Sequence, residues 1–154
     1  MILVIIFLLC ALVITSLLES SYSSLNIIRI KKLMENKNKK AKMVYKLYSK
    51  YSEAITSILV VNCVCSVMVS SLTTYYFSNV YGDGSVTLVT IILTLIVLIF
   101  TEITPKILGR EYSEVVAMRL ALVLKTIMFI LTHSNRFLNI FLNTNSPIIK
   151  YLVK

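Results

Sequence analysis

Three long stretches of the chain carry no charged side chain. They cover residues 1–18, 54–82 and 84–101. Each is long enough for the roughly 18–20 residues with which a helix crosses the hydrocarbon core of a bilayer. The first stretch has neither the basic start nor the small-residue cleavage pattern of a secretory signal, so it is read as a retained helix. The pattern predicts an all-α integral membrane protein with three transmembrane helices.

The basic residues indicate how these helices are oriented. The chain has 154 residues, of which 57% are hydrophobic, and a net charge of +9. Nine of its 16 Lys and Arg residues lie between Arg29 and Lys50, whereas the next connection, around SNVYGDGS, has none. By the positive-inside rule, we expect the basic segment and the C-terminus in the cytosol and the N-terminus outside the cell membrane.

The basic segment 29–52 is predicted to form an amphipathic helical hairpin at the cytosolic face of the membrane. Its lysines are expected to face anionic lipid headgroups. Apolar residues recur among them at helical spacing, at Ile30, Leu33, Met34, Met43, Val44, Leu47 and Tyr48. Nucleic acid is not an expected partner, because the positive-inside rule already accounts for a basic run between two spans.

Residues 111–154 are predicted to form juxtamembrane helices beside a three-span core at residues 1–110. This region is apolar but is interrupted by Arg119, Lys125 and Arg136. A fourth span over residues 115–132 is the alternative. It would place two of these cations in lipid and would deliver the C-terminal lysines outside, and neither is favoured.

Polar side chains inside the spans are the candidates for function, because a polar group in hydrocarbon needs a partner. On the second span, Asn62, Ser66 and Ser70 recur every four residues and share one helix face. Ser70 lies about 12 Å from Asn62 along the helix, too far to bind the same ion directly. The depths expected in the membrane predict one inner-leaflet cluster, made of Ser16, Ser20, Asn62, Ser66 and Glu102.

A proline follows the glutamate in the stretch TEITPKILG, residues 101–109. Pro105 has no N–H to donate to the carbonyl of Thr101, so a kink is expected that frees this oxygen beside the Glu102 carboxylate. All the predicted ligands are hard oxygens, which favours Mg²⁺ over zinc or copper. In the alternative reading, the serines only bond their own helix and Glu102 reaches water.

Three segments together resemble one known family. TEITPKILG is similar to the G-E-[IV]-x-P-K signature of the CorC and cyclin M (CNNM) magnesium transporters, although Thr101 replaces the usual glycine. ITSLLESSYSSLNIIRIKKL is similar to the family's first-helix motif, and ITSILVVNCVCSVMVSS to its second-helix pattern, with Val61 and Cys63 in place of a glycine and an asparagine. The resemblance covers about residues 10–150.

This resemblance implies a homodimeric membrane domain that binds one Mg²⁺ per subunit between its helices. The positions that match the family's ligands are Ser16, Ser20, Asn62 and Glu102. Family members usually continue into a pair of cytosolic CBS modules, and none is expected within this chain.

The expected function is transport of Mg²⁺ across the membrane, in the direction of export, with Na⁺ as a candidate coupling ion. Glu102 is expected to supply the charge, and neutral oxygens come from Ser16, Ser20, Asn62, Ser66 and Thr101. Two alternatives stay open, namely a non-transporting membrane regulator that senses Mg²⁺ or binds a channel partner, and a structural anchor. An enzyme is not expected, because the sequence shows no nucleophile with a positioned base and no phosphate loop.

Overall fold

The computed structural model describes residues 1–81, 91–92 and 94–133, and all the regular secondary structure in them is helical. The GDG turn, the beginning of the third predicted span and the end of the predicted juxtamembrane region lie outside these residues. The helices are α1 (Ile2–Ser23), α2 (Ile27–Glu35), α3 (Lys39–Tyr48), α4 (Tyr51–Tyr81), the π-helix η1 (Ile99–Ile103), α6 (Thr104–Glu111) and α7 (Ser113–His133). A helical segment at residues 94–98 leads directly into η1.

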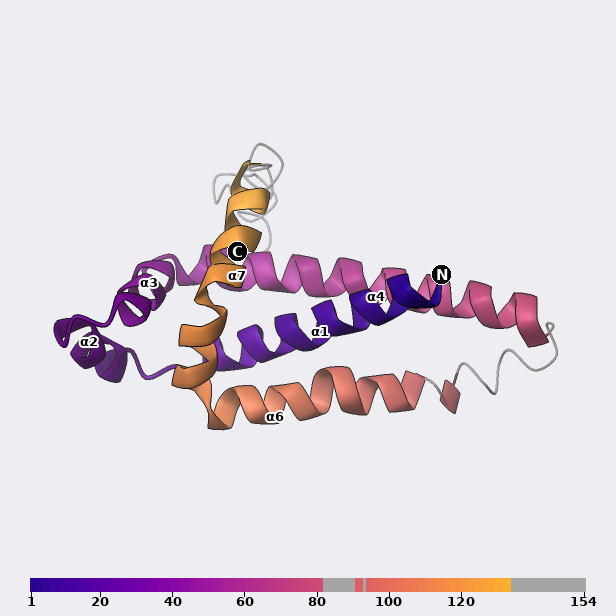
Figure 1. The fold of residues 1–154 in the computed structure, drawn as a ribbon, viewed down its shortest axis with the longest axis horizontal. Coiled ribbons are helices and arrows are strands. Elements are labelled where there is room, and N and C mark those ends of the chain that lie inside the picture. The colour runs from indigo at the N-terminus through magenta and orange to yellow at the C-terminus, as the bar shows by residue number, and fades with distance from the viewer. Residues whose placement is uncertain (82–90, 93, 134–154) are drawn as a thin grey trace, which may run out of the picture.

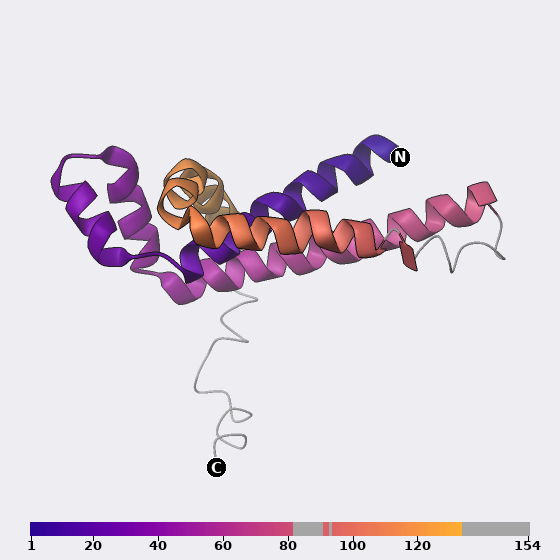
Figure 2. The same ribbon diagram turned by 90° about the horizontal axis from the view of Figure 1, so that it is seen from below.

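Three rods lie alongside one another and form the body of the molecule. They are α1, α4 and the continuous helix 94–111, and α1 contacts both of the others. In Figures 1 and 2, α1 and the helix 94–111 run in one direction and α4 runs in the other. Within the described residues, α1 and α4 are long and apolar enough to cross a membrane, as predicted for the first two uncharged stretches.

The hairpin of α2 and α3 lies at the end of the bundle where α1 ends and α4 begins (Figure 1). Each helix starts at an asparagine cap, since the Oδ1 atom of Asn26 accepts from the backbone N–H of Ile28 at 3.1 Å and that of Asn38 from Lys40 at 3.0 Å. Lys37, between the helices, has a positive φ of 61°. The structure thus has two helices within the basic segment, where the sequence predicts a helical hairpin.

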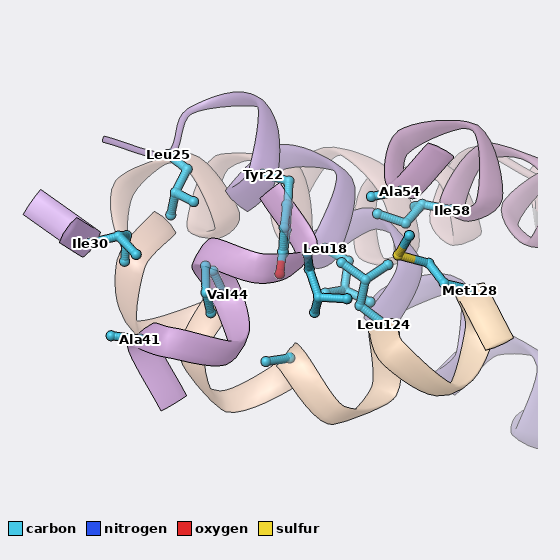
Figure 3. Packing of buried hydrophobic residues seen from close by; sticks show 13 residues of the cluster. Leu18, Tyr22, Leu25, Ile30, Ala41, Val44, Ala54, Ile58, Leu124 and Met128 are labelled. Carbon is cyan, nitrogen blue, oxygen red and sulfur yellow. The ribbon is translucent and has the colours of Figure 1, made fainter. Parts of the chain in front are cut away.

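The apolar face of this hairpin packs into the core of the protein itself. Ile30 and Val44 are fully buried in one cluster with Leu18 and Tyr22 of α1 and Leu124 of α7 (Figure 3). All nine Lys and Arg residues of the hairpin segment stay exposed. The apolar side chains of the hairpin thus pack against the bundle. Its exposed Lys and Arg side chains are the groups that remain to contact a membrane surface.

Helix α7 crosses α1 and α4 close to this same end (Figure 1). One of its faces is buried, and the residues on it are Ala117, Ala121, Leu124 and Met128. Arg119 and Lys125 lie among its exposed residues. Glu114 pairs with Arg29 of α2, with 3.2 Å between Oε2 and Nε, which links α7 to the hairpin. Packing, rather than this half-exposed ion pair, supplies most of the stability of that contact.

One buried hydroxyl in the core invites a test of stability. The side chain of Tyr22 has no exposed surface, and its hydroxyl has no hydrogen-bond partner within the described part of the chain. A buried polar group without a partner costs about 1–3 kcal/mol. Tyr22→Phe is therefore expected to leave the free energy of unfolding in detergent unchanged or to raise it, and the exposed Tyr45→Phe is its control. A loss of more than about 1 kcal/mol would show that the hydroxyl has a partner.

Candidate metal-ion site

A cavity of about 190 Å³ lies between α1, α4 and the helical segment 94–102. Its apolar wall includes Leu12 of α1 and Val69 of α4. Among the residues that the structure describes, Glu102 is the only acidic one that lines it. Six hydroxyl side chains line it as well, and they belong to Ser66, Ser70, Thr73, Thr74, Thr94 and Thr101.

The hydroxyls of α4 lie on one side of that helix because of their spacing. Ser66, Ser70 and Thr74 recur every four residues, and Thr73 is one position away. They extend over about 12 Å of helix. The Thr73 hydroxyl is buried and has no hydrogen-bond partner among the described residues. A buried hydroxyl of this kind usually binds water or an ion, so the cavity is suited to a hydrated cation.

The Glu102 carboxylate belongs to a turn of π-helix. The N–H of Thr104 donates to the carbonyl of Ile99, five residues back, and Pro105 follows with no N–H of its own. The π turn stands where the sequence predicts a kink. The Thr101 hydroxyl donates to the carbonyl of Val97 at 2.8 Å, so this side chain is already bonded within its own helix. Single π turns are frequent at functional sites, because they change the direction in which a side chain points.

The cavity contains half of the predicted ligand set. Ser66, Thr101 and Glu102 line it together. Ser70 also lines it, although its distance from Asn62 had excluded it from a shared site. The remaining three predicted ligands, Ser16, Ser20 and Asn62, are not among its lining residues.

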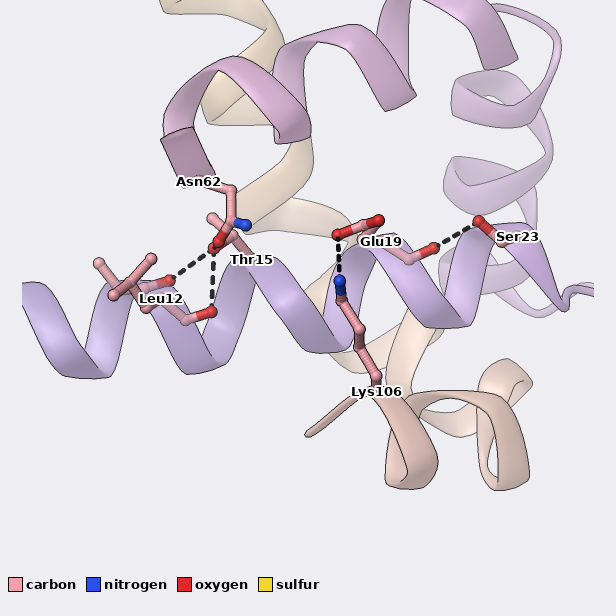
Figure 4. A network of polar contacts seen from close by, with 7 residues as sticks. Leu12, Thr15, Glu19, Ser23, Asn62 and Lys106 are labelled. Atoms are coloured by element: carbon pink, nitrogen blue, oxygen red, sulfur yellow. Dashed lines mark hydrogen bonds and ion pairs between the residues drawn. The ribbon is translucent and has the colours of Figure 1, made fainter. Parts of the chain in front are cut away.

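Asn62 faces α1. Its Oδ1 atom accepts a hydrogen bond of 2.7 Å from the hydroxyl of Thr15 (Figure 4). The Thr15 hydroxyl is also 3.0 Å from the carbonyl of Leu12. In this arrangement Asn62 joins α4 to α1, and its carbonyl oxygen would have to leave Thr15 before it bound an ion.

Ser20 faces α6 at a point of very close approach. A Cβ atom placed on Gly109 would lie 2.9 Å from the Cβ of Ser20 and 2.8 Å from the carbonyl oxygen of Leu17. Since α1 and α6 run in the same direction, equal steps of four residues keep the two helices in register. The two facing stripes are Leu12, Ser16 and Ser20 on α1, and Thr101, Pro105 and Gly109 on the other helix, all of them buried.

Ser16 lies in the middle of this contact. Its Oγ atom is buried and has no hydrogen-bond partner within the described ranges. Leu12, one helical turn earlier, reaches the cavity. The register places Ser16 opposite Pro105, whose missing N–H leaves a carbonyl oxygen of the preceding turn without its usual donor. Within the described residues, a second unpaired hydroxyl thus lies one helical turn from a residue that lines the cavity.

An ion pair that the sequence reasoning missed joins the same two helices. The Nζ atom of Lys106 lies 3.7 Å from Oε2 of Glu19 (Figure 4). Glu19 lies about one turn before the end of α1, and Lys106 lies in the first turn of α6. Their pairing, however, depends on the rotation of α1 and α6 about their own axes, for which the sequence alone gives no measure.

The fold and the cavity together define an all-helical membrane domain with an oxygen-lined site between its long helices. The chain matches the family described as the cyclin M transmembrane N-terminal domain over residues 3–151. It therefore belongs to this family, and the resemblance seen in the sequence is confirmed.

Two bacterial proteins are similar to the chain. The UPF0053 inner membrane protein YfjD of Escherichia coli (strain K12) is 34% identical over 99 residues, which cover 64% of this chain and 23% of that protein. A UPF0053 protein of Haemophilus influenzae is also 34% identical over 99 residues, which cover 64% of this chain and 24% of that protein. The aligned part of the chain thus spans about a quarter of the length of each relative.

Proposed function

We propose that this domain binds Mg²⁺ in the cavity beside Glu102 and exports it across the membrane. One observation carries the proposal: a carboxylate within a π turn shares a cavity with six hydroxyl side chains. The family to which the chain belongs is a transmembrane one, which supports a role at the membrane. The resemblance to magnesium transporters supplies the identity of the ion.

The chemistry of the lining residues fits Mg²⁺ as the transported substrate. This ion takes about six oxygens at about 2.0–2.1 Å and usually keeps several of its waters. Glu102 supplies a negative charge, and Ser66 and Ser70 supply neutral oxygens from the facing helix. The unpaired hydroxyl of Thr73 extends this oxygen set along α4, in the direction that an ion crossing the domain would take. Ser16, Ser20 and Asn62 complete the site if α1 shifts during transport.

The arrangement of the elements supports three spans with the basic hairpin in the cytosol. The rods are α1, α4 and the helix ending at residue 111, and the basic residues of α2 and α3 lie at one end of them. Helix α7 crosses the rods near that end, an orientation that suits the inner membrane interface better than a fourth span. In this proposal the N-terminus lies outside the cell membrane and the described end of α7 lies at its cytosolic face.

A homodimer is part of the same proposal. Helix α4 exposes a series of large apolar side chains, which are Leu59, Val60, Val64, Val67 and Met68. Lipid or a second copy of the chain would cover them, and the family resemblance favours the second copy. Na⁺ is the proposed coupling ion, and membrane lipids are the proposed surroundings of the exposed apolar faces.

Filling the cavity tests whether it is the ion site. Ser66→Leu is expected to lower the Mg²⁺ affinity of the purified chain at least about tenfold, because the larger side chain occupies space next to Glu102 and removes one oxygen. Ser71→Leu is the matched control, since Ser71 is an exposed residue of the same helix and does not line the cavity. Titration calorimetry in detergent measures both. Equal affinities in the two variants would place the ion elsewhere.

Flux separates transport from regulation. Liposomes that contain the wild-type chain and a Mg²⁺-sensitive dye are expected to show Mg²⁺ movement that Ser66→Leu slows and Ser71→Leu does not. Binding without movement would support the alternative of a membrane regulator that senses Mg²⁺. Movement that depends on an opposing Na⁺ gradient would support coupled export.

A further inference from the structure

The ammonium group of Lys106 lies near two carboxylates, those of Glu19 and Glu102. Its ammonium lies 3.7 Å from Oε2 of Glu19 on α1. Glu102, which lines the cavity, precedes Lys106 by four residues on the same helix, a spacing at which side chains are neighbours. The side chain of Lys106 is 37% exposed, so it has room to change its position. A single tethered cation is thus within reach of the cavity carboxylate and of a second carboxylate outside the cavity.

The ion pair between Lys106 and Glu19 is loose. Among the described residues, it is nevertheless the interaction that offsets the burial of the Glu19 carboxylate oxygen. A separation of 3.7 Å exceeds hydrogen-bond distance. Oε2 of Glu19 is out of contact with solvent and accepts no hydrogen bond from the residues that the structure describes. An ionised oxygen in such a place needs a nearby positive charge. The Lys106 ammonium therefore supplies the positive charge at Glu19 that a bound metal ion would otherwise supply.

We propose that Lys106 acts as a built-in cation that occupies the Glu19 carboxylate and thereby directs the divalent ion to Glu102. Lys106 is a positioning residue in this scheme, because it acts through the two carboxylates. The inference rests on the proposed function, since it assumes that the cavity receives a divalent cation. It makes two predictions of opposite sign, one for the loss of Lys106 and one for the loss of Glu19.

Removal of the ammonium is expected to create a second ion site. Titration calorimetry of the full chain in detergent should give one Mg²⁺ per chain for wild type, two for Lys106→Met, and one again for Lys106→Met combined with Glu19→Gln. Arg110→Met is the control, because Arg110 is exposed, lies four residues further on, and has no ion pair among the described residues. One Mg²⁺ per chain in both wild type and Lys106→Met overturns the inference.

Removal of Glu19 alone is expected to weaken binding at Glu102. Without its partner, the ammonium is free to approach the cavity carboxylate and competes with Mg²⁺, so Glu19→Gln should raise the Kd about five- to tenfold, a usual size for coupling between two sites. The double variant should restore the wild-type Kd. A purely structural ion pair would lower thermal stability in both single variants and leave the Kd unchanged. This second measurement decides the question if Lys106→Met does not fold.

The two proposals fail in different ways. If wild type binds no Mg²⁺ but Lys106→Met binds one ion that Glu19→Gln removes, the proposed function is wrong, and of the role of Lys106 only the occupation of the Glu19 carboxylate stands. If wild type binds one ion at Glu102 and neither substitution changes number or affinity, the proposed function stands and the role of Lys106 is wrong. Absence of binding in every folded variant overturns both.

Discussion

Glu102→Gln is expected to reduce the Mg²⁺ affinity of the chain by at least about two orders of magnitude. Glutamine keeps the size and one oxygen of the side chain but removes its charge. Loss of a group that only supports a metal ligand already costs about 10–100-fold in affinity, and the loss of a charged ligand costs more. Because Glu102 is the one acidic residue among those described around the cavity, no other side chain there replaces the lost charge.

The control for this substitution is Glu111→Gln. Glu111 is exposed at the end of α6 and lies outside the cavity lining. The Mg²⁺ affinity of the Glu111→Gln variant should therefore equal that of wild type. Calorimetry gives the affinities, and thermal unfolding in the same detergent shows that both variants remain folded. Wild-type affinity in a folded Glu102→Gln variant would exclude the cavity as the ion site and would support the alternative of a structural anchor.

Periodicity and charge predicted the course of the chain well, because both are properties of position along it. The first two uncharged runs predicted α1 and α4. The apolar spacing at Ile30, Val44 and Leu47 predicted the helical hairpin. Pro105 marked the point at which the helix departs from α geometry. Where the apolar face of the hairpin would pack did not follow from the pattern, since protein core and membrane interface both accept such a face.

The composition of the site was harder to predict, because depth in a membrane fixes one coordinate of a residue and leaves the rotation of its helix undetermined. Asn62 and Ser66 are at similar depth, yet Asn62 bonds Thr15 of α1 whereas Ser66 lines the cavity. Ser70 appeared too distant from Asn62, and the cavity instead extends along α4 from Ser66 past Ser70. The pairing of Glu19 with Lys106 likewise depends on how the packed helices are rotated.

Gly109→Ala is expected to destabilise the fold by about 1–3 kcal/mol, the usual range for an overfilled contact. The added methyl would lie 2.8 Å from the carbonyl oxygen of Leu17 and 2.9 Å from the Cβ of Ser20, and neither atom moves by a change of rotamer. Alanine favours helix over glycine by about 1 kcal/mol, which offsets part of the cost. Leu108→Ala is the neighbouring control, because Leu108 is exposed. Thermal unfolding in detergent measures both.

A double-mutant cycle tests whether Ser20 is the neighbour that gives way. Ser20→Gly removes one of the two close contacts and leaves the one to Leu17, so it should restore only part of the stability lost in Gly109→Ala. If the added methyl of Gly109→Ala pushes α6 away from α1, Glu102 moves as well, because it belongs to the π turn that precedes α6. Mg²⁺ affinity is therefore expected to fall in Gly109→Ala. Additive effects in the cycle would mean that Ser20 and Gly109 do not restrain each other, and the contact with the Leu17 carbonyl would then account for the loss of stability.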